Sequence, residues 1–161
     1  MTIDDYLDLV ADALGCLDEF HGIGIIVDHQ QDVETRQKEL LAKGMGYMVM
    51  IGEVSNRIDQ KNDDGPVINL KFGITVYSPK IITGKRRTGA QLRDVILSRI
   101  HLSKLQRSQH CYDEAYYVDG KIFEEKDGNK HRMIHATAFE TRVTYKAHED
   151  LEDNQPFNPN Q

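Results

Sequence analysis

Two histidine patterns in the sequence have residue types that could do chemistry. His131 and His135 stand four apart on a segment with strand-like alternation, so both side chains would project from one face, as two metal ligands do. No Cys, Asp or Glu motif completes a ligand set, which favours ordinary histidines over a zinc site. His110 and Cys111 are adjacent, and adjacent side chains rarely form a nucleophile and base pair. A pocket around His110, His131 and His135, in a small enzyme or ligand-binding domain, is kept as an alternative.

Other catalytic patterns are incomplete. Gly84-Lys85 would belong to a phosphate loop only with a glycine five positions before Gly84, and Pro79 stands there. The carboxylate pairs Asp63-Asp64 and Glu124-Glu125 flank predicted turns, where solvated ends are commoner than acid-base pairs. The sequence has no GxSxG, HExxH or GxGxxG motif. These observations favour assembly or binding over catalysis, so we expect no enzyme activity and no cofactor.

Charge is the stronger pattern, because it is distributed unevenly along the chain. The 161 residues include 20 Lys and Arg against 26 Asp and Glu, and the net charge of -6 argues against general nucleic-acid binding. Residues 1–35 contain no Lys or Arg, whereas residues 80–107 are strongly basic with Asp94 as their single acid. Complementary charged patches steer association, and head-to-tail contacts between subunits can close into rings. A solvated charge distribution without a role is the alternative.

The candidate interface residues follow from this charge pattern. The basic candidates stand in and after a predicted loop: Lys80, Lys85, Arg86, Arg87 and Arg93. The acidic candidates stand on the first predicted helix: Asp4, Asp5, Asp8 and Asp12. The basic loop suits an acidic protein surface or passing DNA. Sequence-specific DNA reading is not expected, because the helix after the loop uses its face for hydrophobic residues.

Hydrophobic spacing predicts the elements that position these residues. Thr2 and Asp5 form a capping box, and apolar residues at three-to-four spacing from Tyr6 to Phe20 predict a helix that stops at Gly22. Thr88 and Gln91 form a second capping box before the best helix of the chain. Another helix is expected over residues 32–43. Strands are expected over residues 23–27, 47–51, 67–77, 115–125 and 131–145, with loops at 56–65 and 78–89 and a turn at 126–129.

This element order predicts an α+β fold. The order is α-β-α-β-β-α-β-β, and its hairpin-like links favour a largely antiparallel sheet with helices packed on one face. Residues 1–146 are expected to form a single domain. Residues 147–161 are acidic and then rich in Asn, Gln and Pro, which predicts a flexible tail or an arm ordered by a partner. With no apolar run long enough to span a membrane and only two cysteines, the chain is expected in the cytoplasm.

Three segments taken together resemble tail terminator proteins of long-tailed bacteriophages. They are the alternating strand at residues 72–79 (FGITVYSP), the capped helix with residues 92–96 (LRDVI) and the closing strand at residues 138–145 (AFETRVTY). The early helix with Leu14 fits the same pattern. The resemblance covers residues 2–146 in topology and includes no catalytic signature. The helix near residues 32–43 and the acidic tail depart from the simplest members of the family.

The resemblance implies a structural role in the virion. Subunits of this family form a ring, commonly of six, which caps the completed tail tube and presents a surface to the head-tail connector protein. The expected partners are therefore other copies of the chain, the tail tube protein and the connector, after assembly in the host cytoplasm. On this view Lys85, Arg86 and Arg87 contact the tube or a neighbouring subunit. A monomeric adaptor that binds one protein through the acidic first helix is a further alternative.

Overall fold

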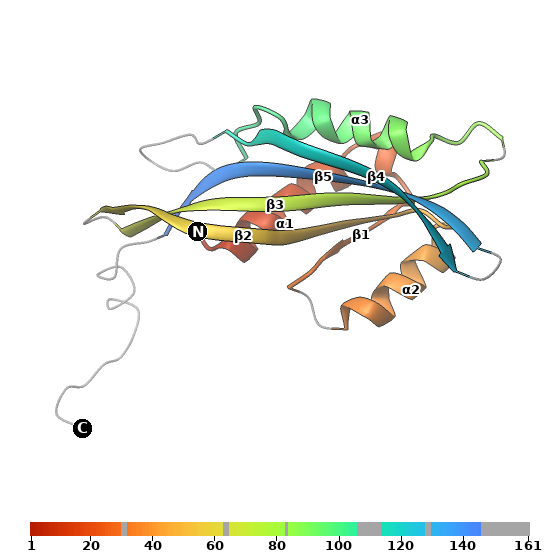
Figure 1. Ribbon diagram of the computed structural model, residues 1–161, viewed down its shortest axis with the longest axis horizontal. Coiled ribbons are helices and arrows are strands. Elements are labelled where there is room, and N and C mark those ends of the chain that lie inside the picture. Colours follow the sequence, from red (N-terminus) through yellow and green to blue (C-terminus); the bar gives the residue numbers. More distant parts are fainter. Residues whose placement is uncertain (30–31, 63–64, 83, 106–113, 128–129, 146–161) are drawn as a thin grey trace, which may run out of the picture.

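The structure of the chain is a computed structural model (Figure 1). It describes residues 1–29, 32–62, 65–82, 84–105, 114–127 and 130–145. The helices are α1 (Ile3–Gly15), α2 (Val33–Lys43) and α3 (Gly89–Ile100), with a single 3-10 turn, η1 (Asp18–Phe20). The strands are β1 (Gly24–Val27), β2 (Met48–Asn62), β3 (Gly65–Pro79), β4 (Tyr116–Asp127) and β5 (Lys130–Thr144). Among the helices described, none is long and apolar enough to cross a membrane.

The five strands form one sheet in the order β1-β2-β3-β5-β4. β1 pairs with β2 in parallel, and the other pairs are antiparallel. β3 is the central strand, and it buries alternate side chains along most of its length, from Leu70 to Ser78. The predicted α+β class, the largely antiparallel sheet and the element order are confirmed.

The helices divide between the two faces of the sheet. α1 and α3 cover one face, where the main core includes Tyr6 and Val10 from α1, Leu92 and Ile96 from α3, and Phe72 from β3. α2 packs on the other face of the sheet. Its Leu41 forms a second, smaller core with Ile26 of β1 and Met48 of β2, whose strand neighbours Val27 and Val49 belong to the main core. The expectation of helices on one face therefore holds for α1 and α3 and is wrong for α2. The weak apolar stripe of α2 gave no indication of which face it would cover.

Both predicted capping boxes are present. The Thr2 hydroxyl accepts from the Asp5 amide at 3.1 Å, and the Asp5 carboxylate accepts from the Thr2 amide at 2.9 Å. Thr88 and Gln91 make the same reciprocal pair at the start of α3, at 3.1 and 2.9 Å. Each pair satisfies backbone donors that the first turn of a helix leaves free, so the sequence signal and the structure agree.

Two predicted boundaries are wrong. α1 ends at Gly15, and extended backbone at Leu17 then turns the chain so that Phe20, on η1, still enters the main core. The polar segment 56–65 is not a loop, because β2 continues to Asn62 and pairs with β3 as far as Gly65. That part of the hairpin projects past the helices (Figure 1), so no alternation of apolar residues is needed to form it.

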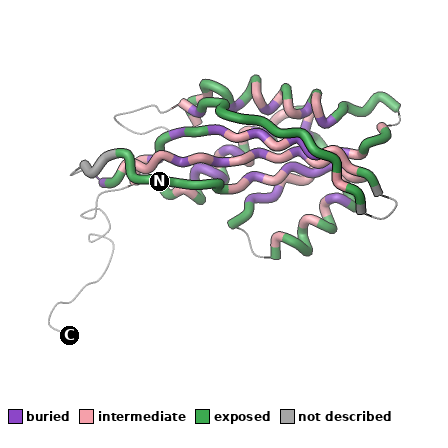
Figure 2. The backbone as a smooth tube through the Cα atoms, in the orientation of Figure 1, coloured by how far each residue is buried: buried purple, intermediate pink, exposed green. Residues whose placement is uncertain are grey.

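β4 is the outer strand at one edge of the sheet. The predicted interruption at Asp119 and Gly120 is a shift of register between Tyr117 and Asp119 that leaves Val118 without an opposite residue in β5. Residues 116–124 are exposed along the whole stretch (Figure 2), including large apolar side chains. Their exposed fractions are 50% for Tyr116, 45% for Val118, 57% for Ile122 and 50% for Phe123. This edge of the sheet therefore presents apolar surface on its outer strand.

Replacing Phe72 by Ala tests the main core. Phe72 is fully buried, with the Tyr6 ring edge-on at 5.4 Å and the Phe139 ring stacked at 5.6 Å. We expect the free energy of unfolding to fall by about 3–5 kcal/mol, because the lost contacts leave a cavity. Urea denaturation measures it, with Ile81→Ala as the control, since the Ile81 side chain is 81% exposed. Equal destabilisation by the two substitutions would contradict this account of the core.

Candidate subunit interface

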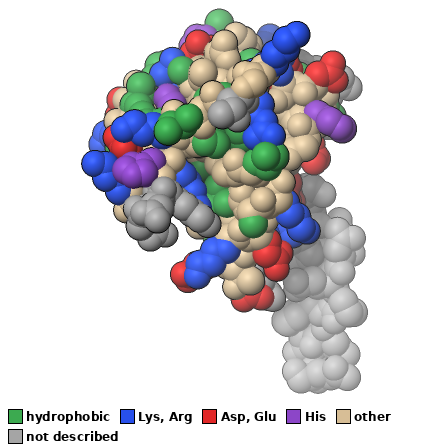
Figure 3. Space-filling view, turned by 90° about the vertical axis from the view of Figure 1, so that its right-hand side faces the viewer, with side chains coloured by type: hydrophobic (Ala, Val, Ile, Leu, Met, Phe, Trp, Pro, Cys, Tyr) green, Lys and Arg blue, Asp and Glu red, His purple; other side chains and the backbone are tan. Residues whose placement is uncertain are grey.

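The predicted basic loop lies at one end of the molecule. It leaves β3 after Pro79 and enters α3 at Gly89, beside the C-terminal end of α2 and the start of β2. The Tyr47 hydroxyl donates to the Arg87 carbonyl oxygen at 2.9 Å, which fixes the loop to the residue before β2. Figure 3 looks onto this end, where Lys and Arg side chains surround hydrophobic and backbone surface. The loop is thus exposed, as predicted, and anchored.

A hollow of about 320 Å³ opens beneath the loop. Four of its lining residues are cations, from the loop and from the end of α2: Lys43, Lys85, Arg86 and Arg87. Asp18 and Glu19 of η1 are its two acidic lining residues, and its apolar lining includes Ile23, Tyr47 and Leu92. None of the four cations lies in an ion pair within the described part of the chain. The hollow therefore combines an apolar floor with unneutralised positive charge, which suits an acidic ligand with an apolar side chain.

Met45 stands beside this hollow in a strained conformation. Its φ of 54° lies in the left-handed region, where residues other than glycine are disfavoured by roughly 1–2 kcal/mol. The amide of Gly46 donates to the Leu41 carbonyl at 2.7 Å, which closes the end of α2 around this residue. The Met45 side chain is 62% exposed, and its sulfur lies 2.7 Å from a guanidinium nitrogen of Arg86. An exposed apolar side chain therefore stands among the cations.

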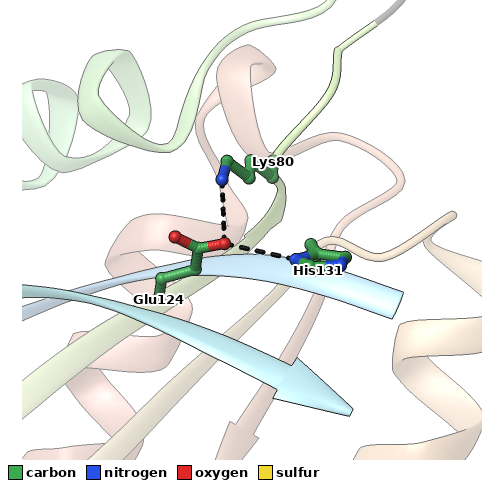
Figure 4. A network of polar contacts seen from close by, with 3 residues as sticks. All are labelled: Lys80, Glu124 and His131. Atoms are coloured by element: carbon green, nitrogen blue, oxygen red, sulfur yellow. Dashed lines mark hydrogen bonds and ion pairs between the residues drawn. The ribbon is translucent and has the colours of Figure 1, made fainter. Parts of the chain in front are cut away.

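Lys80 belongs to a separate polar network at the same end (Figure 4). Its ammonium group donates to Glu124 Oε1 at 2.9 Å, and the same oxygen lies 3.2 Å from His131 Nδ1. The Lys80 hydrogen bond, followed by that of His131, holds the pKa of Glu124 below its usual value. Lys80 is thus largely neutralised within the subunit, unlike Lys85, Arg86 and Arg87.

Arg93 does not join the basic hollow. It lies on α3, where its guanidinium group donates to the neighbouring Asp94 at 3.1 Å. Arg93 also acts on His135, whose pKa is lowered first by burial and then by this nearby cation. The predicted basic set therefore divides into three: the loop cations, the Lys80 network and the ion pair on α3.

The predicted acidic residues all lie on the exposed side of α1. Two of the four have local roles, since Asp5 caps the helix and Asp8 accepts from His29 Nε2 at 2.8 Å. The backbone hydrogen bond from Thr2 is the main cause that lowers the pKa of Asp5. The hydrogen bond to Asp8 raises the pKa of His29. Asp4 and Asp12 are exposed and make no ion pair among the residues described, so they are the candidates for outside contacts.

The two described histidines of the alternative pocket, His131 and His135, lie in different surroundings. His131 is exposed beside Pro79 and Lys80, whereas His135 is buried under Gly89 at the start of α3. His110 and Cys111 lie outside the described residues. Among the residues that are described, no three His, Cys, Asp or Glu side chains form a group that could hold a metal ion.

Several residues at the hollow were not singled out from the sequence. Lys43, Met45, Asp18 and Glu19 lie far from the basic loop in the chain, and only the fold brings them to it. The Gly-Met-Gly stretch at residues 44–46 was the one available signal, because a residue other than glycine between two glycines after a helix is a candidate for a strained turn.

Comparison with known proteins finds a likeness in structure and none in sequence. The sequence matches no protein-family model, and it has no match among curated proteins. Its structure is similar to a solved chain of the virion of a native gene transfer agent particle, with a TM-score of 0.54 and 12% sequence identity. The match covers 84% of this chain and 92% of that chain. At this identity the likeness shows a shared fold.

Replacing Asp8 by Asn tests the contact between α1 and the segment after β1. We expect the pKa of His29 to lie above its ordinary value in the native chain and to fall in Asp8→Asn, because the carboxylate that stabilises its cation is lost. Since the folded state raises this pKa, the stabilisation is fully present below pH 6.5 and is lost as the pH rises through the folded-state pKa. Titration of the His29 ring protons by NMR measures both values.

Asp12→Asn is the matched control for this titration. It removes the same charge one turn further along α1, where no hydrogen bond to His29 exists among the described contacts. The His29 pKa is expected to move little. An equal shift in both variants would show that the net charge of the helix, and not the hydrogen bond, raises this pKa.

Proposed function

We propose that this chain is a structural virion protein of a phage-like particle, and that it forms a ring which terminates the tail tube and joins it to the head connector. The observation that carries the proposal is the fold shared with a chain of a gene transfer agent virion over 84% of this chain and 92% of that one. The resemblance to tail terminators, read from the strand and helix pattern, points to the same class of protein. The role needs no chemical reaction.

The charged surfaces support a contact between unlike faces of neighbouring copies. The acidic side of α1 and the cations at the hollow come from different elements, so one copy can present both at once. Contacts between two unlike faces are heterologous, and such contacts repeat from copy to copy and form a ring when the rotation between neighbours closes. Opposite charges also make the association fast and sensitive to salt. This arrangement supports the proposed ring, for which the family resemblance implies six copies.

Light scattering on the purified chain, alone and with the tail tube protein from the same source, tests the ring. We expect a closed oligomer, either from the chain itself or on addition of the tube protein. The mass per particle gives the number of subunits directly. A strict monomer under both conditions would overturn the proposal and would favour a ligand-binding or adaptor role.

Reversing the charge of the loop tests its part in assembly. The triple variant carries Lys85→Glu, Arg86→Glu and Arg87→Glu. We expect it to need a protein concentration at least tenfold higher for assembly, because three unneutralised cations at the hollow become anions. Light scattering across a dilution series measures the change, and thermal unfolding of the variant verifies that the fold is retained.

A matched charge reversal away from the hollow is the control. Arg36, Arg57 and Arg99 are exposed on α2, β2 and α3, and their replacement by Glu changes the net charge by the same amount. This control is expected to assemble like the native chain. If both triple variants assemble normally, the loop has no role in subunit contacts.

A further inference from the structure

We propose that the hollow beneath the basic loop binds the acidic segment 149–153 of a second copy of this chain. This inference rests on the proposed function in one respect, namely that copies of the chain contact each other, and it names the contact.

The hollow has the charge and lining of a site for an acidic peptide. Lys43, Lys85, Arg86 and Arg87 supply four positive charges that no carboxylate neutralises within the described chain. Asp18 and Glu19 line the same hollow and reduce the net charge of the lining to about +2. The apolar residues Ile23, Tyr47 and Leu92 offer contacts to an apolar side chain.

The segment 149–153 has the complementary composition. Its sequence is Glu-Asp-Leu-Glu-Asp, and no Lys or Arg occurs between residues 147 and 161. Leu151 stands between two pairs of carboxylates, which matches an apolar floor with cations on its rim. Charge pairs across an interface fix the register of the partners, and a buried apolar anchor holds them together.

Distance excludes binding within the same copy. β5 ends beside the start of β3, where the Tyr145 amide donates to the Pro66 carbonyl at 3.0 Å. The hollow lies at the other end of β3, because Tyr47 precedes Met48, which pairs with Tyr77. The 11 residue steps from Pro66 to Tyr77 span roughly 36 Å of strand. The eight residue steps from Tyr145 to Asp153 reach at most roughly 29 Å when fully extended.

The end of β5, which the segment follows in the chain, and the hollow therefore lie at opposite ends of the sheet, as Figure 1 shows for the end of β5 and the loop after β3. A contact between them joins two different faces of two copies. Such a contact is heterologous, and it leaves each copy with one free hollow and one free segment for the next neighbours. The same geometry that excludes binding in one copy thus favours a repeating chain of contacts.

Two variants of the full chain test the proposal by complementation. The segment variant carries Glu149→Gln, Asp150→Asn, Glu152→Gln and Asp153→Asn, and the hollow variant carries Lys85→Glu, Arg86→Glu and Arg87→Glu. Each variant alone is expected to self-associate at least tenfold more weakly than the native chain. Mixed in equal amounts, they are expected to form a one-to-one complex, because one supplies an intact hollow and the other an intact segment. Analytical ultracentrifugation measures both results.

A synthetic peptide of residues 146–161 with a fluorescent label supplies the direct measurement. Its fluorescence anisotropy is expected to rise when the segment variant is added, because that variant has an intact hollow. The hollow variant is expected to need a concentration at least tenfold higher for the same rise. Added salt is expected to lower the anisotropy, because it screens the charges. A peptide with the order of residues 147–153 scrambled keeps the charge and displaces Leu151, and it is expected to bind more weakly. Equal binding of the peptide to both protein variants would overturn the proposal.

The outcomes separate this proposal from the proposed function. If the segment variant forms the same ring as the native chain, the segment is not the ligand and the ring stands. If the peptide binds the hollow but neither the chain nor its mixture with the tube protein forms a ring, the contact stands and the proposed function fails. If Asp4→Asn, Asp12→Asn abolishes assembly and the segment variant does not, α1 and not the segment occupies the hollow.

Discussion

The packing of Phe72 between Tyr6 and Phe139 is the interaction on which the rest of the structure depends. It joins α1, the central strand β3 and the neighbouring strand β5 at one point, although these elements are distant in sequence. Burial of these rings fixes which face of β3 turns inward, and a shift of one residue would expose the whole inward row from Leu70 to Ser78. With the register fixed, the basic loop must leave the sheet at one end and β5 must finish at the other.

Much of this arrangement could be predicted from the sequence, because its signals are local. The alternation along β3 and the capping boxes at Thr2 and Thr88 depend on neighbouring residues, and all three were found in the structure. The continuation of β2 to Asn62 could not be predicted, since backbone pairing with β3 forms that strand and the side chains exposed over residues 53–59 need no pattern. The position of α2 was equally inaccessible, because Leu41 meets Ile26 and Met48 only in the folded chain.

The candidate site could likewise be predicted from the sequence in part. The exposed basic loop could be predicted from its glycines, its proline and its run of cations, whereas its environment could not. Lys43 and the η1 carboxylates line the hollow because folding brings distant parts of the chain together. Lys80 instead donates to Glu124, which lies 44 positions away in the sequence. Charge counted along the sequence therefore located the exposed cations of the loop but could not show that Lys80 and Arg93 form ion pairs within the chain.

The position of β4 at the edge of the sheet has a consequence for how two copies of the chain could meet. An edge strand with exposed aromatic side chains is a template on which another sheet can add. The unpaired Val118 interrupts the regular spacing of backbone groups along β4, and Asp119 and Lys121 follow it with charge. A second strand would find matched hydrogen-bond partners over short stretches alone. The irregularity in β4 thus limits the length over which a second strand could pair with this edge, although its side chains are apolar and exposed.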